Sequence, residues 1–186
     1  MFRTPEEKWH KDCIHEATKG AGIKLMVWAC IWGRNKGHLI PIFEKSIDRF
    51  VYIGILEDGL VDVWQEVEDT VGDPIFQQDG AKIHTARDTM AWFAENHIQV
   101  MEWPPTSPDL NPIDHCSKRV KEKLHQRFTN IHKTMGGPDT VRKHLAEAFN
   151  QVWAQDIEAE FLERLWESLP NRVAAVLDGR GWYTKY

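Results

Sequence analysis

The stretch Lys24-Leu25-Met26-Val27-Trp28-Ala29-Cys30-Ile31-Trp32 is almost continuously apolar and carries β-branched and aromatic side chains. A run of this length and composition predicts a buried strand. Residues 34–37 have the composition of a turn, and residues 38–43 form a second run of strand type. The two runs together predict an antiparallel hairpin at the start of a sheet.

Strands and helices alternate after this hairpin. Apolar residues between 46 and 67 recur at helical spacing, whereas Ile75 and Phe76 predict a short strand with a polar end. Residues 85–95 predict a helix, with Thr85 and Asp88 at a spacing similar to that of a capping box. Alternating apolar residues from 98 to 103 predict a further strand. Parallel strand–helix units are therefore expected to follow the hairpin.

The last part of the chain is predicted to be helical. Four prolines between 103 and 112 exclude regular structure there, and Asn111 and Pro112 suit the N-cap and first position of a helix over 112–128. Periodic apolar residues predict further helices over 138–153, 157–169 and 170–177. This order of elements predicts an α/β domain over residues 24–186, with a mixed sheet flanked by helices. It is the order of the ribonuclease H-like fold without its first strand, after an irregular lead-in over residues 1–23.

Composition limits the classes of protein to consider. A length of 186 residues, 42% hydrophobic residues, 27% charged residues and nine tryptophans fit one packed globular domain. No apolar run is long enough to span a membrane, and polar residues 1–11 do not resemble a signal peptide. Three cysteines without a CxxC pair favour a reducing, intracellular setting. We therefore expect neither a membrane protein nor a secreted disulfide scaffold.

Two acidic residues occupy positions where chemistry is common. Asp79 ends a short strand, and ligands bind at this end of strands in α/β folds. Asp114 lies in the first turn of the helix over 112–128, where the helix dipole favours a carboxylate. Each also has a purely structural explanation, because Asp79 precedes Gly80 in a turn and Asp114 can stabilise the start of a helix.

Two motifs around these residues favour the functional reading. The stretch Phe76-Gln77-Gln78-Asp79-Gly80-Ala81-Lys82-Ile83-His84-Thr85-Ala86 resembles the segment around the second catalytic Asp of mariner-like DDE transposases. The stretch Trp103-Pro104-Pro105-Thr106-Ser107-Pro108-Asp109-Leu110-Asn111-Pro112-Ile113-Asp114 resembles the segment that ends in their third acidic residue. The 34 residues between Asp79 and Asp114, positions 80–113, match the separation in that family. Segments 168–172 and 181–186 also look like the family's C-terminal end.

The resemblance implies a metal-dependent DNA enzyme with a ribonuclease H-like fold. Asp79 and Asp114 would be catalytic and would hold two Mg²⁺ or Mn²⁺ ions, which suit carboxylate ligands. Such ions activate the attacking oxygen and stabilise the leaving oxygen in phosphodiester cleavage and strand transfer. The partners implied are transposon-end and target DNA, with a possible homodimer and no small-molecule substrate. Nuclear localisation is implied in the same way.

Several other candidate residues near the two motifs allow both a functional and a structural interpretation. Gln78 is expected beside the metal ligands, and His84 either positions a phosphate or carboxylate or caps a helix. Trp103 and the loop with Asn111 either shape a DNA groove or only fix the start of the helix. Basic residues could contact phosphates or form a solvated helix face, and the net charge of −5 counts against a nucleic-acid binder. These basic residues are Lys118, Arg119, Lys121 and Lys123.

The chain departs from the family's pattern at its start. The family has a further metal-binding Asp on a strand before the hairpin, but residues 1–23 hold only Asp12, among polar neighbours. His10, Cys13 and His15 lie close together but have no second ligand cluster to complete a zinc site. We therefore expect impaired cleavage, marginal stability and poor solubility. The alternatives are a decayed or domesticated module that binds DNA or protein without catalysis, and a part of a longer, active transposase.

Overall fold

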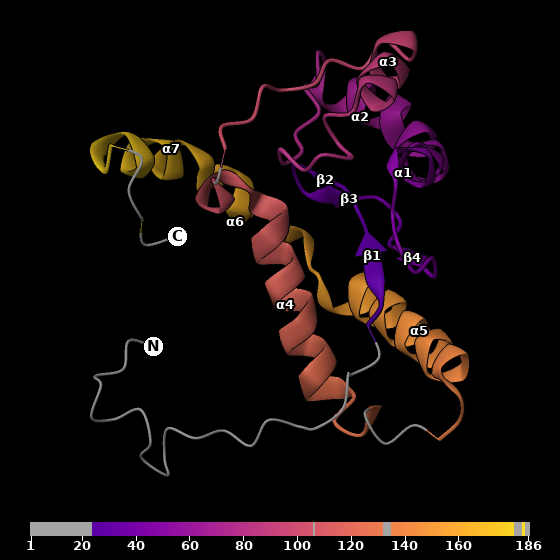
Figure 1. The fold of residues 1–186 in the computed structure, drawn as a ribbon. Helices are drawn as coiled ribbons and strands as arrows, with labels where there is room; N and C mark the ends of the chain where they lie inside the picture. The colour runs from indigo at the N-terminus through magenta and orange to yellow at the C-terminus, as the bar shows by residue number, and fades with distance from the viewer. Residues whose placement is uncertain (1–23, 106, 132–134, 181–183, 185–186) are drawn as a thin grey trace, which may run out of the picture.

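The computed structural model describes residues 24–105, 107–131, 135–180 and 184. A short hairpin lies between two groups of helices, one drawn in magenta and one in orange and yellow (Figure 1). The strands are β1 (Met26–Trp28), β2 (Ile31–Trp32), β3 (Asn35–Lys36) and β4 (Ile40–Ile42). The α-helices are α1 (Arg49–Leu56), α2 (Asp62–Val71), α3 (Arg87–Glu95), α4 (Pro112–Arg127), α5 (Pro138–Asp156), α6 (Ala159–Glu167) and α7 (Leu169–Asp178).

The predicted hairpin is present, but its turn is displaced. β1 pairs antiparallel with β4, and β2 pairs with β3, with Trp32 opposite Asn35. The turn is therefore Gly33-Arg34 rather than residues 34–37, and the second strand begins at Asn35. Gly33 has φ +52°, a conformation that glycine adopts without a steric cost, so it allows a tight two-residue turn.

One long helix spans residues 49–71, where the sequence predicted 46–67, with a π-helical segment, η3 (Glu57–Val61), between α1 and α2. It begins only at Arg49, because the side chain of Asp48 accepts hydrogen bonds from the backbone N–H groups of Phe50 and Val51. Gly59 lies in the π-helical segment, close to Trp28 and Ile40 of the hairpin. The helix therefore approaches the strands through a residue that lacks a side chain.

The parallel part of the expected sheet is reduced to one bridge. Phe76 pairs in parallel with Val100, through the bonds Phe76 N–H to Gln99 C=O and Met101 N–H to Phe76 C=O. Within the described part of the chain, no strand connects this bridge to β1. Residues 25–33 and 73–79 instead line a common cavity of about 950 Å³. The two described parts of the expected sheet are thus separated by a cavity.

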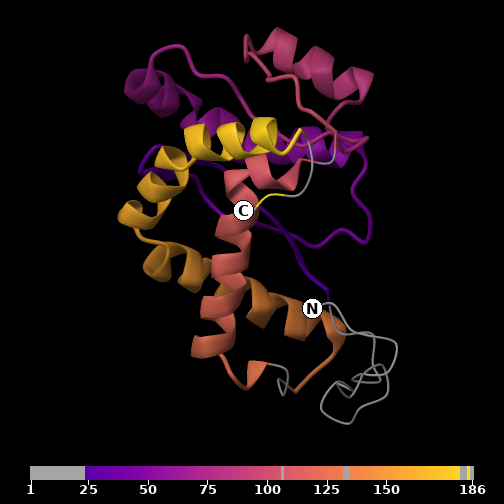
Figure 2. The ribbon, with the colours of Figure 1, turned by 90° about the vertical axis from the view of Figure 1, so that its left-hand side faces the viewer.

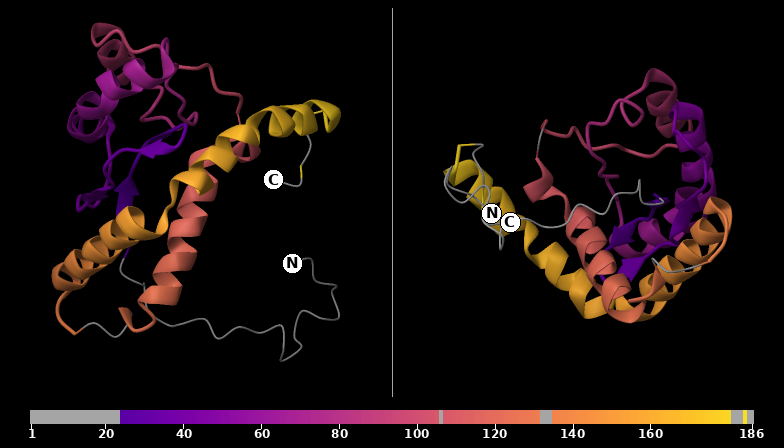
Figure 3. Two further views of the ribbon diagram at one scale, coloured as in Figure 1. Left: turned by 180° about the vertical axis from the view of Figure 1, so that it is seen from behind. Right: turned by 60° about the horizontal axis from the view of Figure 1, so that its bottom comes forward.

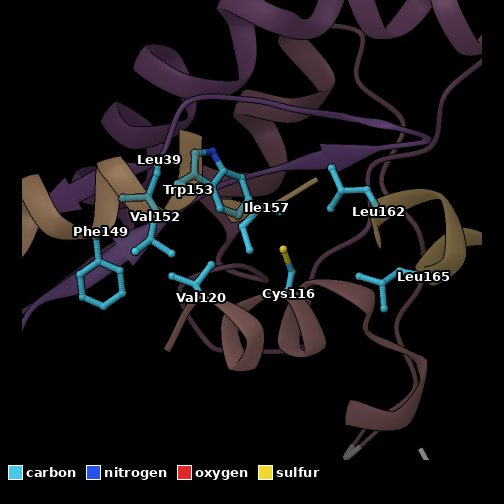
Figure 4. Packing of buried hydrophobic residues seen from close by; sticks show 9 residues of the cluster. All are labelled: Leu39, Cys116, Val120, Phe149, Val152, Trp153, Ile157, Leu162 and Leu165. Atoms are coloured by element: carbon cyan, nitrogen blue, oxygen red, sulfur yellow. The ribbon is translucent and has the colours of Figure 1, made fainter. Parts of the chain in front are cut away.

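Side chains of the hairpin alternate between two cores, as the period of a strand requires. Trp28 packs on the core formed with α1 and α3, which includes Leu56 and Phe93. Ala29 and Ile31 pack on the opposite core. The buried residues of that core come from the end of the hairpin and from α4, α5 and α6 (Figure 4). The hairpin is thus the central layer, although its strands are short.

The helices of the C-terminal half begin and end close to their predicted limits. α7 lies across the segment that leads into α4 (Figures 2 and 3). That segment contains a short 3₁₀ helix, η4 (Pro108–Leu110), where no regular structure was expected. None of the described helices has the length and apolar character needed to cross a bilayer.

Candidate catalytic site

Asp79 and Asp114 face the same cavity, although 34 residues separate them in the chain. Burial, the largest cause, raises the pKa of Asp114. A hydrogen bond from Asn111 lowers this pKa, and the negative charge of Asp79 raises it. The two carboxylates are therefore close enough to repel each other, which is the arrangement that a cation between them would stabilise.

Asp79 follows the Phe76 bridge and is held by two donors. Its Oδ1 accepts a hydrogen bond from the backbone N–H of Ala81 at 3.0 Å and lies 2.6 Å from Nδ1 of His84. The ring of His84 in turn lies against Tyr52, with 4.4 Å between ring centroids. His84 thus contacts the Asp79 carboxylate and the ring of Tyr52, and no side chain caps the start of α3. Its role in positioning a phosphate or carboxylate stays a prediction.

Gln78, the neighbour of Asp79 in the chain, is buried, with 9% of its surface exposed. The Tyr52 hydroxyl donates to Gln78 Oε1 at 2.7 Å, and Gln78 Nε2 donates to the backbone oxygen of His84 at 3.3 Å. Burial, and to a lesser degree the charge of Asp79, raises the pKa of Tyr52, so this hydroxyl remains a donor. Both polar atoms of the Gln78 side chain therefore have partners, Tyr52 and His84, next to Asp79.

The start of α4 carries Asp114. Asn111 occupies the N-cap position, but its Nδ2 donates to Asp114 Oδ2 at 3.3 Å and its side chain makes no capping bond to the helix backbone. Gln77 Nε2 donates to the backbone oxygen of Leu110 at 3.3 Å and reaches Asn111 Oδ1 at 3.5 Å. The segment that holds Asp79 and the start of α4 are thus connected directly.

The four basic residues of α4 fall on two faces. Lys118 and Lys121 are four and seven positions after Asp114, on the same helix face, and Lys121 lines the cavity. Arg119 instead lies over the ring of Phe161 in α6, with Lys123 one turn later on that face. The first pair therefore shares a helix face with Asp114, and the second pair does not.

Trp103 is half-buried and is not among the residues that line the cavity. Its predicted contribution to a DNA groove therefore remains a prediction.

The donor set fits part of a site for Mg²⁺ or Mn²⁺. Carboxylate oxygens are the ligands that these hard cations prefer, and Asp79 and Asp114 supply them at one cavity. Within the described ranges, no three His, Cys, Asp or Glu side chains form a group that could hold a metal ion. Asp12, His10, Cys13 and His15 lie outside those ranges. The described residues thus provide two of the three carboxylates that the resemblance implies.

Comparison with known proteins shows the family. The sequence pattern described as DDE superfamily endonuclease matches residues 11–135, which include both acidic motifs. The chain belongs to the DDE superfamily endonucleases. It is 32% identical over 173 residues to the Tcb2 transposase of Caenorhabditis briggsae and 33% identical over 172 residues to the Tc1 transposase of Caenorhabditis elegans. The alignments cover 92% and 90% of this chain but 58% and 56% of those proteins, so this DDE domain spans little more than half their length.

Solved structures show the same fold. The Mos1 transposase catalytic domain with Raltegravir and Mg superposes with a TM-score of 0.58 at 24% identity, over 87% of this chain and 76% of that one. The Mos1 mariner paired-end complex with Mn gives a TM-score of 0.58 at 21% identity, over 91% of this chain and 48% of that one. The ribonuclease H-like fold predicted for this DDE transposase domain is thereby confirmed.

Sequence reasoning missed several residues that build the site. Tyr52 supports the Asp79 side through Gln78, Gln77 connects that side to the start of α4, and Arg172 holds the loop before α4 at Asp109. Tyr52 offered one signal, as a polar ring in an otherwise apolar stretch of helix. Arg172 lies in the C-terminal motif that resembles the family, but nothing in its local sequence indicates a contact 63 residues away.

Proposed function

We propose that this domain cuts and joins DNA phosphodiester bonds with Asp79 and Asp114 as ligands for Mg²⁺ or Mn²⁺. The observation that carries the proposal is the convergence of these two carboxylates on one cavity, within a chain of the DDE superfamily. When bound, the cations lower the barrier by stabilising charge on the attacking and leaving oxygens. The transposon ends and target DNA of relatives are the substrate class that we assign.

The surrounding residues have two roles, to orient the two carboxylates and to contact the DNA. His84 keeps Oδ1 of Asp79 in one orientation, and Asn111 does the same for Oδ2 of Asp114. Lys118 and Lys121 would contact DNA phosphates beside the carboxylates, since both lie on the helix face of Asp114. We expect slow cleavage by this chain, because the described residues supply two carboxylates rather than three.

Nicking of supercoiled plasmid in Mn²⁺ tests the proposal. We expect slow nicking by the wild-type chain and none by Asp79→Asn or Asp114→Asn. Asp62→Asn, which alters an exposed acid of α2, is the matched control and should retain wild-type nicking. Equal nicking by wild type and both site variants would show a contaminating nuclease and contradict the proposal.

A second candidate function is DNA binding without cleavage. Lys118 and Lys121 favour it, because they form a basic pair on one face of α4. Salt-sensitive DNA binding by a wild-type chain that does not nick DNA at all would favour this function over catalysis.

A further inference from the structure

The loop before α4 is held by a buried arginine from the far end of the chain. Arg172 of α7 has 4% of its surface exposed. Its Nη1 donates to the backbone oxygen of Asp109 at 3.0 Å and lies 2.7 Å from Nε2 of His115. These two contacts bracket the five residues from Leu110 to Asp114, so Asp114 lies between the two points that Arg172 holds.

Asp109 has a second contact with the C-terminal segment. Its Oδ2 accepts hydrogen bonds from the backbone N–H of Thr184 at 3.2 Å and from the Thr184 hydroxyl at 2.7 Å. The backbone and the side chain of Asp109 are therefore both bound by residues that follow α6. Neither Arg172 nor Thr184 lies within residues 11–135, where the family pattern matches.

The opposite side of the same loop contacts the segment that leads from Phe76 to Asp79. Gln77 donates to the backbone oxygen of Leu110, one residue after Asp109. The loop is thus fixed between the Asp79 segment and α7. Displacement on either side would change the separation of the two carboxylates.

A simpler reading is that Arg172 only anchors α7 to the domain. Its Nε bond to the hydroxyl of Ser168, at 2.7 Å, is internal to the start of that helix and fits this reading. Both Nη1 contacts, however, cross to residues on either side of the turn that starts α4. A residue that only anchors α7 could contact any surface of the domain. These contacts instead lie on the segment that positions Asp114.

We propose that Arg172 is a positioning residue that fixes the Asp114 carboxylate relative to Asp79 for metal binding. This inference rests on the proposed function of the two carboxylates. Residues that orient metal ligands without touching the metal change affinity by roughly 10- to 100-fold when they are removed. A change of that size is expected for Arg172 if the loop moves when its contacts are lost.

Mn²⁺ affinity of the whole chain, measured from the electron paramagnetic resonance signal of free Mn²⁺, tests the inference. We expect wild type to bind Mn²⁺, Asp114→Asn to lose binding, and Arg172→Gln to bind roughly 10- to 100-fold more weakly. Arg164→Gln, at an exposed position of α6, should bind as wild type does. Val152→Ala, in the buried core of α5, controls for loss of stability by lowering the melting temperature while leaving Mn²⁺ affinity unchanged.

Each other outcome is decisive. Wild-type affinity in Arg172→Gln overturns the inference and leaves the proposed function intact. An equal loss of affinity in Val152→Ala also overturns it, because the effect would then follow from general stability. No Mn²⁺ binding by wild type overturns both the proposed site and the role of Arg172.

Discussion

At the scale of single residues, the partly covered Asp114 carboxylate shows how burial and a nearby charge act on the same group. Burial and the nearby Asp79 both raise its pKa, so the charged form is less favourable in the folded protein than in the unfolded chain. A raised carboxyl pKa costs no stability below the ordinary pKa of aspartate. The cost grows as pH rises through the raised pKa, and it is complete near neutral pH.

Removal of this charge should therefore stabilise the protein in a pH-dependent way. We expect Asp114→Asn to raise the melting temperature at pH 7 more than at pH 4, measured by circular dichroism. Asp62→Asn, at an exposed position, should show little difference between the two pH values. A larger gain for Asp114→Asn at pH 4 would contradict the assigned sign.

Gly59 gives a second prediction at the level of single residues. A Cβ at this position would lie 2.5 Å from Trp28 Cζ3 and 2.6 Å from Ile40 Cδ1. We expect Gly59→Ala to lower the free energy of unfolding by about 1–3 kcal/mol, the usual cost of overpacking. In α1, a Cβ at Gly54 would meet nothing within 4 Å, so Gly54→Ala should instead stabilise by up to about 1 kcal/mol. Urea denaturation of the two variants measures this contrast, and equal effects would refute it.

At the scale of elements, α4 carries both the acidic ligand and the basic pair, and its two faces can be separated experimentally. Lys118→Gln combined with Lys121→Gln should weaken DNA binding, and should reduce the slope of log affinity against log salt by about 0.9 for each lysine. Arg119→Gln combined with Lys123→Gln removes the same charge from the other face and should leave the slope nearly unchanged. Fluorescence anisotropy with a short duplex at several salt concentrations distinguishes the faces. The same loss in both double variants would show a diffuse electrostatic effect instead.

The elements also show what sequence alone can and cannot predict. Pro112 and the helical spacing after it placed α4 within one residue, because these signals are local. The turn predicted over residues 34–37 lies at Gly33-Arg34, and Thr85 donates to the backbone oxygen of Ala81 rather than forming a capping box. The Asp79 and Asp114 motifs predicted the carboxylates, but the contacts of Tyr52 and Arg172 depend on chain segments that only the fold brings together.

At the scale of the whole molecule, the cavity between the hairpin and the Phe76 bridge should limit stability. Buried indole N–H groups of Trp32, Trp64 and Trp166 have no hydrogen-bond partner among the described residues, and all three side chains line this cavity. Each unsatisfied donor and each exposed strand edge is unfavourable. The chain should thus bind a hydrophobic dye such as ANS in its native state and melt over a broad, low range. A cooperative transition at about 60 °C from a monodisperse monomer without dye binding would contradict this expectation.

The π-helical segment between α1 and α2 changes the direction in which the side chains after it point. Each residue of an α-helix turns the direction of the side chain by about 100°, and a π turn contains an extra residue. Tyr52, Leu56 and Leu60 accordingly point into the core with α3, whereas Val63 and Val67 join Trp32 in a separate cluster. One apolar stripe in the sequence therefore covers two surfaces. In a regular α-helix with the same residues, all of these apolar side chains would point to one side. Trp32, at the end of the hairpin, would then lack the contacts of Val63 and Val67.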